Sequence, residues 1–344
     1  MTVLNEEMTL GEIMEMKNFR ELGRYFIGVD HPDMGKWKTY DFDQMESVFG
    51  VRKESILAGL NRLYEVETAT KSCLHRIYRE EEIEEDPRKS DAVLMDFPTE
   101  EEYVERPYIL ILAGGAYVNV YSILEAFPSA AYFNRMGYHA LVLNYRTGGT
   151  RVMPDSLDDL AQAVRYIKEH EEQLHVNGNN YIVTGFSAAG NLTAEWGNPM
   201  QGYQKYELPK PKALFLGYPV INIDLFQTAL PEEEEKREKM IRENAWFLNT
   251  MLGENVSQEE IERYNVDTCA DATYPPSYLV CCKDDPTVPY IHSVHLEKKL
   301  KDLDIPVEIE IGNRGGHGFG TGYGTDCEDW ITRAIIFEQK LQEQ

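Results

Sequence analysis

One serine lies between a short β-branched run and a helix-compatible stretch, and this limits the folds open to the chain. Ser187 follows Val183-Thr184-Gly185-Phe186 and precedes Ala188-Ala189-Gly190. A serine on a sharp strand-to-helix turn has a strained backbone, so the residues two before and two after it must be nearly free of side chain. Gly185 and Ala189 meet this demand. The pattern predicts a nucleophile elbow, with the hydroxyl at a helix N-terminus whose free N–H groups stabilise an oxyanion.

An acid and a base for that serine follow later in the chain. The predicted strand 278–282 ends in a polar loop with two carboxylates, Asp284 and Asp285, and either can orient an imidazole. The predicted strand 307–311 runs into a glycine-rich segment that contains His317, and the glycines let the backbone turn this side chain toward the serine. Serine, acid, histidine is one of the known chain orders of a catalytic triad, so Ser187, one of the two acids and His317 are the predicted members.

A second donor for an oxyanion hole is expected after the predicted strand 108–112. That strand is followed by Ala113-Gly114-Gly115-Ala116-Tyr117, whose small residues leave room for a substrate carbonyl. The N–H groups of Gly115 and Ala116 are expected to act with that of Ala188. A double glycine is also found in ordinary turns and in phosphate loops. No Gly-X-Gly-X-X-Gly or Gly-X-X-X-X-Gly-Lys-Ser/Thr string accompanies it, so nucleotide binding is not expected.

Taken together, these segments resemble the α/β-hydrolase superfamily, and within it the bacterial esterase/lipase group with acetyl esterases, feruloyl-type esterases and relatives of hormone-sensitive lipase. The segments that carry the resemblance are 113–117, 144–146, 185–190, 218–220, 285–289 and 315–319, and it covers roughly residues 72–342. It implies an α/β fold with a mostly parallel central sheet and helices on both faces. The family places its acid directly before Pro-X-Val-Pro, which selects Asp285. Ala116 and Ala189 stand where the family has glycine; both keep a backbone N–H, so geometry and pocket width are affected more than activity.

Composition and charge exclude several classes of function. The chain has 344 residues, 42% of them hydrophobic, with no apolar run near the ~20 residues needed to cross a bilayer. Its formal charge of −25 argues against nucleic-acid binding. The five cysteines are odd in number and lack metal-ligand spacing, and the first residues lack the pattern of a signal peptide. We therefore expect a cytoplasmic protein with no metal or other cofactor and no membrane partner.

The chain divides into three parts by pattern. Residues 1–70 are predicted to be a helical extension, with apolar residues at near-helical intervals through 42–63. Residues 71–344 are the predicted hydrolase domain, interrupted at about 222–274 by a charged, helical cap insertion. The apolar stripe of the extension needs burial, either beside the pocket or at a homodimer contact. The cap aromatics either pack on their own base or line the pocket, and the candidate pocket residues are Tyr117, Phe186, Trp246 and Phe247.

The expected activity is hydrolysis of a small-molecule carboxylic ester through an acyl-enzyme. Short acyl groups are favoured, because the insertion is too short and too charged for the broad apolar lid of an interfacial lipase. Aromatic acyl groups are implied by the resemblance alone. A serine peptidase of the same fold would use the same triad. A non-catalytic small-molecule-binding protein on this fold is expected to have lost a triad member, whereas all three are present here.

Overall fold

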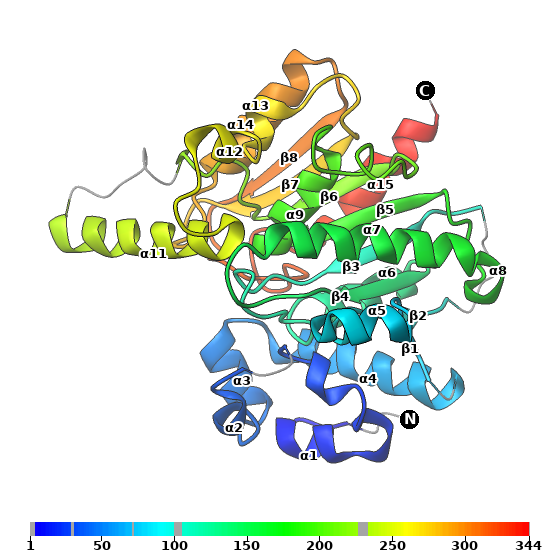
Figure 1. The fold of residues 1–344 in the computed structure, drawn as a ribbon. Helices are drawn as coiled ribbons and strands as arrows, with labels where there is room; N and C mark the ends of the chain where they lie inside the picture. Colours follow the sequence, from blue (N-terminus) through cyan, green and yellow to red (C-terminus); the bar gives the residue numbers. More distant parts are fainter. Residues whose placement is uncertain (1–3, 29–30, 71, 100–104, 226–232, 344) are drawn as a thin grey trace.

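An eight-stranded sheet forms the centre of the molecule (Figure 1). The computed structural model describes residues 4–28, 31–70, 72–99, 105–225 and 233–343. The strands lie in the order β1-β2-β4-β3-β5-β6-β7-β8. Their bounds are β1 Leu74–Arg76, β2 Val93–Phe97, β3 Tyr108–Leu112, β4 Ala140–Asn144, β5 Tyr181–Phe186, β6 Ala213–Gly217, β7 Ser277–Cys282 and β8 Val307–Gly312.

Most of this sheet is parallel. β2 pairs antiparallel with both β1 and β4, whereas each pairing from β4 through β8 is parallel. Every residue of β3, β4, β5, β6 and β7 is buried, as expected for parallel strands covered on both faces. The carboxyl ends of β3, β5, β6, β7 and β8 therefore meet at one edge of the sheet, where α/β folds place their ligand sites. The predicted fold class is confirmed.

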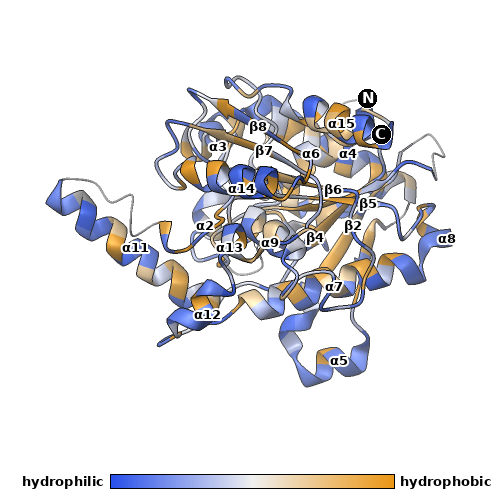
Figure 2. Ribbon diagram, turned by 90° about the horizontal axis from the view of Figure 1, so that it is seen from above, coloured by the Kyte–Doolittle hydropathy of each residue, from blue (hydrophilic) through white to orange (hydrophobic). Residues whose placement is uncertain are grey.

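Helices cover both faces of the sheet. α7 (Met153–Glu169) and α9 (Ser187–Gly197) lie on one face, and α6 (Ala126–Arg135) and α15 (Trp330–Gln342) lie on the other (Figures 1 and 2). The strands between them are mostly hydrophobic (Figure 2). The other helices of this part are α5 Glu80–Glu85, η3 Pro87–Asp91, α8 Glu171–Leu174 and α14 Ile291–Asp302.

The N-terminal extension packs on α6 and shares the hydrophobic core of the sheet. Its helices are α1 Leu10–Glu15, η1 Lys17–Phe19, η2 Gly23–Tyr25, α2 Met34–Trp37, α3 Phe42–Phe49 and α4 Lys53–Thr70. The buried side chains of α4, Ile56, Leu60 and Leu63 among them, belong to the same core cluster as the strands. The apolar pattern over 42–63 is divided between two helices, because Gly50 adopts a left-handed conformation with φ +73° and ends α3. The boundary expected near residue 70 stays a prediction.

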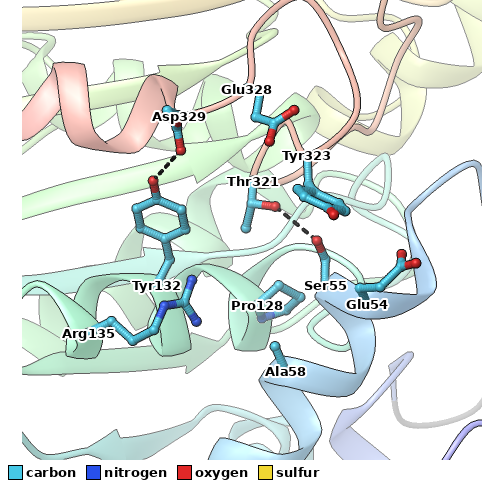
Figure 3. Close-up of a pocket in the computed structure, with 10 residues that line it drawn as sticks. All are labelled: Glu54, Ser55, Ala58, Pro128, Tyr132, Arg135, Thr321, Tyr323, Glu328 and Asp329. Atoms are coloured by element: carbon cyan, nitrogen blue, oxygen red, sulfur yellow. Dashed lines mark hydrogen bonds between the residues drawn. The ribbon is translucent and has the colours of Figure 1, made fainter.

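Side-chain hydrogen bonds also connect the extension and α6 to the segment that leads into α15. Ser55 Oγ on α4 lies 3.2 Å from Thr321 Oγ1, and Tyr132 on α6 donates to Asp329 at 2.8 Å (Figure 3). These groups surround a cavity of about 170 Å³ (Figure 3). The extension is thus held against the rest of the molecule by polar contacts as well as by apolar packing.

The described part of the segment between β6 and β7 contains three helices, α11 Glu234–Leu252, α12 Gln258–Glu262 and α13 Val266–Cys269. α11 extends outward from the body of the molecule (Figure 1). Residues 226–232 of the predicted cap insertion lie outside the described residues, and its expected limits of 222–274 stay a prediction. Within the described part of the chain, no helix combines the length and the apolar character needed to cross a membrane.

Candidate active site

Ser187 lies at a strained turn between β5 and α9. It is the first residue of α9, and its φ of +53° is in the left-handed region that residues with a side chain rarely adopt. A Cβ at position 185 would overlap Thr193 Oγ1 and the carbonyl oxygen of Ala189, so only glycine fits there. Ala189 is buried, and its methyl group is accommodated in the core. The local geometry is thus that of the turn predicted from the sequence.

The three predicted triad residues form a hydrogen-bonded chain. Ser187 Oγ lies 2.8 Å from Nε2 of His317, and Nδ1 of the same ring lies 2.7 Å from Oδ2 of Asp285. The Asp285 side chain is fully buried, and its Oδ1 accepts from the backbone N–H groups of Thr287 at 2.8 Å and Val288 at 2.9 Å. The residues come from the ends of β5, β7 and β8. The arrangement gives a hydroxyl a base to receive its proton and gives that base a fixed orientation.

The neighbouring carboxylate, Asp284, has a different set of contacts. Its Oδ1 accepts from the backbone N–H of Gly316 at 2.9 Å and of Gly315 at 3.1 Å. These hydrogen bonds, led by the one from Gly316, hold the pKa of the Asp284 carboxyl below its usual value. The structure therefore brings Asp285 to the imidazole of His317 and uses Asp284 to hold the backbone just before that histidine.

The turn after β3 faces Ser187. Val118 and Asn119 both donate backbone N–H groups to the Gly115 carbonyl at 3.0 Å, and a Cβ at position 115 would overlap the backbone of Asn119. Ala116 has φ +54°, a left-handed conformation that glycine adopts more readily than alanine. Among the described residues, the amide N–H groups of Gly115, Ala116 and Ala188 have no hydrogen-bond acceptor in the protein. Three donors near one hydroxyl are what an oxyanion hole requires.

Two cavities meet at Ser187, and the wall between them includes Ala116, Trp246 and Thr287. The first, of about 460 Å³, is lined by the 114–116 turn, His317 and residues of α3 in the extension. The second, of about 450 Å³, lies between α11 and the segment 286–288. Ser187 thus lines two separate cavities.

The predicted pocket residues fall into two groups. Trp246, which is 50% exposed, lines both cavities, and Phe247 lines the second. Tyr117 and Phe186 differ from the expectation, because neither lines either cavity. The Tyr117 hydroxyl donates to Asn191 Oδ1 at 2.8 Å inside the core. Phe186 is the last residue of β5, and its ring packs beside Tyr218 and Trp330 in the core.

Sequence reasoning missed several residues around the site. Val48 and Phe49 reach the first cavity from α3, which is far away in the chain. Glu125 also lines that cavity although it is 5% exposed, and burial raises the pKa of its carboxyl against the lowering effect of hydrogen bonds from Tyr218 and Gly114. Glu125 is the single acid in the otherwise apolar run 123–127, and this pattern could have indicated a buried carboxylate. Tyr218 belongs to the segment 218–220 that carries the family resemblance, but the sequence assigned it no role.

In the described part of the chain, no cluster of three or more His, Cys, Asp or Glu side chains has an arrangement that holds a metal ion. The polar cavity between α4, α6 and the segment before α15 (Figure 3) has no histidine or cysteine in its lining.

Comparison with known sequences places the chain among carbohydrate-active and esterase relatives. Endo-1,4-beta-xylanase B from Butyrivibrio fibrisolvens is 24% identical over 248 residues, which cover 70% of this chain and 36% of that protein. The acetylxylan esterase of Xylanibacter ruminicola is 25% identical over 219 residues, which cover 62% of this chain and 41% of that protein. The chain thus spans about two fifths of the length of these curated relatives.

Solved structures share the fold over most of their length. An acetyl ester-xyloside bifunctional hydrolase from Caldicellulosiruptor lactoaceticus superposes with a TM-score of 0.62 at 23% identity, covering 78% of this chain and 95% of that one. Esterase B from Lactobacillus rhamnosis gives a TM-score of 0.60 at 16% identity, covering 85% and 97%. The predicted resemblance to the esterase group is confirmed. Since the BD-FAE family model matches residues 95–300, more than half of the sequence, the chain belongs to the BD-FAE family of α/β hydrolases.

Proposed function

We propose that the protein is a serine carboxylesterase that cleaves short-chain acyl or aromatic-acyl esters through an acyl-enzyme. The observation that carries this proposal is the continuous chain of hydrogen bonds from Ser187 Oγ through the imidazole of His317 to Asp285, at 2.8 and 2.7 Å. Membership of a family with esterase relatives supports the same class of reaction.

In the proposed mechanism, Ser187 Oγ attacks the ester carbonyl while Nε2 of His317 takes its proton. The Asp285 carboxylate keeps the Nδ1 proton in place and stabilises the imidazolium. The carbonyl oxygen gains negative charge, which the N–H groups of Gly115, Ala116 and Ala188 stabilise. The imidazolium then gives its proton to the leaving alkoxide, so that the alcohol departs and an acyl-serine remains. Water attacks that ester with His317 again as base, which releases the carboxylic acid and restores Ser187.

The lining of the cavities supports a short acyl group and a polar alcohol. The buried Glu125 carboxylate lines part of the first cavity, and a long alkyl chain placed beside it would further desolvate this polar group. The second cavity carries Lys239, Glu243 and Asn244 beside the aromatic rings of α11. Charged side chains next to aromatic rings suit a hydroxyl-rich partner better than an alkyl chain. Together with the names of the xylan-related relatives, this favours acetylated plant carbohydrates as substrates.

The test combines covalent labelling with an ester series. A fluorophosphonate is expected to modify Ser187, as located by mass spectrometry, and Ser187→Ala is expected to lose labelling and at least about a thousandfold of the turnover of 4-nitrophenyl acetate. Ser156→Ala, which removes a buried serine hydroxyl on α7, is the matched control and keeps both. Acetyl to butyryl esters should be cleaved faster than decanoyl esters, and acetylated xylan should release acetate. Normal turnover by Ser187→Ala would overturn the mechanism, and a rate maximum at decanoyl would overturn the substrate class.

A further inference from the structure

A second buried carboxylate, Glu125, lies in the site and has no part in the mechanism above. It directly precedes α6, is 5% exposed, and lines the same cavity as Ser187 and His317. Removing a carboxylate from water is costly unless hydrogen bonds replace its hydration. The partners of its two oxygens therefore indicate what the side chain does.

One carboxylate oxygen holds the turn that carries the candidate oxyanion donors. Oε2 of Glu125 accepts from the backbone N–H of Gly114 at 2.6 Å. Gly114 is in close contact with the elbow, because a Cβ at this position would lie 2.9 Å from Cβ of Ser187. The next two residues, Gly115 and Ala116, both have positive φ, so the turn is strained. The bond to Glu125 fixes where that strained turn begins.

The other oxygen reaches the segment that carries the candidate base. Oε1 of Glu125 accepts from the hydroxyl of Tyr218 at 2.7 Å, and that hydroxyl in turn accepts from the backbone N–H of Gly320 at 3.0 Å. The Tyr218 ring packs edge-on against the imidazole of His317 with 4.9 Å between centroids. Three glycines in this segment, at 316, 318 and 320, have positive φ. A segment with so many glycines has little intrinsic preference for one backbone shape.

We propose that Glu125 is a positioning residue which, through Tyr218, holds the 114–116 turn and the segment 317–320 in a fixed relation to Ser187. This inference rests on the proposed function. It explains why a carboxylate is buried here: its two oxygens accept from two donors that belong to two different loops. Glutamine has a single acceptor oxygen at this position. If its NH2 group faced the N–H of Gly114, that hydrogen bond would be lost; if it faced Tyr218, it would donate to the hydroxyl, and the hydroxyl proton would lose its acceptor.

The chain offers a matched control in Glu195. This glutamate is fully buried on α9, and its Oε2 accepts from the side-chain amide of Asn198 at 2.8 Å. Burial raises its pKa well above the ordinary value. Glu195→Gln therefore tests the effect of changing a buried glutamate close to Ser187 in the chain, without touching either loop.

The experiment compares Glu125→Gln, Tyr218→Phe, the double variant and Glu195→Gln with the natural protein on 4-nitrophenyl acetate. Loss of loop placement is expected to lower kcat about a hundredfold in Glu125→Gln, while KM changes by less than about threefold. Tyr218→Phe should lower kcat as well, and the double variant should be no worse than the more impaired single variant, because both remove one connection. Glu195→Gln should stay within about twofold of the natural protein.

A second readout does not need ester turnover. We expect the proton between His317 Nδ1 and Asp285 to give a far-downfield resonance in proton NMR, which should shift or broaden in Glu125→Gln and be unchanged in Glu195→Gln. A natural protein that neither labels with a fluorophosphonate nor cleaves esters refutes the proposed function. An active natural protein with a Glu125→Gln variant of unchanged kcat and unchanged resonance refutes the positioning role alone. Independent, multiplicative losses in the double variant would also refute it, because Glu125 and Tyr218 would then act separately.

Discussion

The substitution Asp285→Asn gives a direct test of how the candidate triad is assembled. Asp285 Oδ1 is held by the backbone N–H groups of Thr287 and Val288, and Oδ2 faces Nδ1 of His317. An asparagine oxygen would keep the two backbone donors, so the NH2 group would take the place of Oδ2. An NH2 group cannot accept from Nδ1–H. The imidazole would therefore carry its proton on Nε2, where it could not receive the proton of Ser187.

The magnitude follows from this change of tautomer. Replacing the acid of a serine triad by asparagine with the geometry intact costs kcat on the order of 10⁴-fold. At about 1.4 kcal/mol for each factor of ten, this corresponds to about 5.5 kcal/mol of transition-state stabilisation. The fold should be little affected, since asparagine has nearly the same volume and the two backbone hydrogen bonds remain. The assay is steady-state hydrolysis of 4-nitrophenyl acetate, with thermal unfolding measured on the same samples.

Asp284→Asn is the matched control for this prediction. Its Oδ1 already accepts from both Gly315 and Gly316, and an asparagine oxygen can keep these bonds while losing their charge assistance. The expected loss of kcat is less than about tenfold, because the backbone before His317 is loosened without changing the tautomer. A larger loss in Asp284→Asn than in Asp285→Asn would move the triad acid to Asp284. Small, equal losses in both would refute the tautomer argument.

Three further predictions concern the stability of the fold around the site. Burial lowers the pKa of His292 to about 3, so below pH 6.5 the unfolded chain binds a proton that the folded chain does not, and stability should fall by about 2 kcal/mol from pH 7 to 5. Urea unfolding at the two pH values checks this, and an equal slope in His292→Asn would contradict it. Gly185→Ala places a Cβ against Thr193 and should lower both the melting temperature and the turnover. An unchanged melting temperature and turnover would contradict the steric argument. Leu60→Ala on α4 should cost about 2–5 kcal/mol in urea unfolding if the extension belongs to the core, whereas a loss near zero would make it a separate appendage.

The features that sequence could predict are those that local sequence determines. The turn at Ser187 needs a residue without a side chain two positions earlier, and Gly185 meets that need within the same short segment. The alternation of strands and helices was likewise readable from local patterns, and the predicted fold is confirmed. The assignment of Asp285 over Asp284 came from the resemblance, because two adjacent carboxylates in a loop are equivalent by pattern alone. Their roles in catalysis stay predictions.

The sequence was less informative about the direction of side chains and about which distant segments line the cavities. Tyr117 and Phe186 adjoin residues of the site in sequence, yet neither lines either cavity. The Tyr117 hydroxyl is directed at Asn191 inside the core, and Phe186 ends a strand that is buried on both faces. Phe49 is the last residue of α3, which contacts α4, and α4 in turn packs on α6. Its place in the cavity lining therefore depends on tertiary packing rather than on any local motif.

The order of the strands explains why the site is assembled from segments so distant in the chain. β3, β5, β6, β7 and β8 are neighbours in the sheet, and their carboxyl ends carry in turn the Gly114 turn, Ser187, Tyr218, Asp285 and His317. Tyr218 therefore follows the strand between those that carry Ser187 and Asp285, and from there its hydroxyl contacts both Glu125 and the segment after His317. In the proposed arrangement, Asp285 faces Nδ1 of the imidazole, whereas Glu125 is connected through Tyr218 to the segment that follows His317. Because the strand order brings Glu125 and Tyr218 into contact, we expect substitutions of these two residues to lower activity non-additively, although 93 residues separate them in the chain.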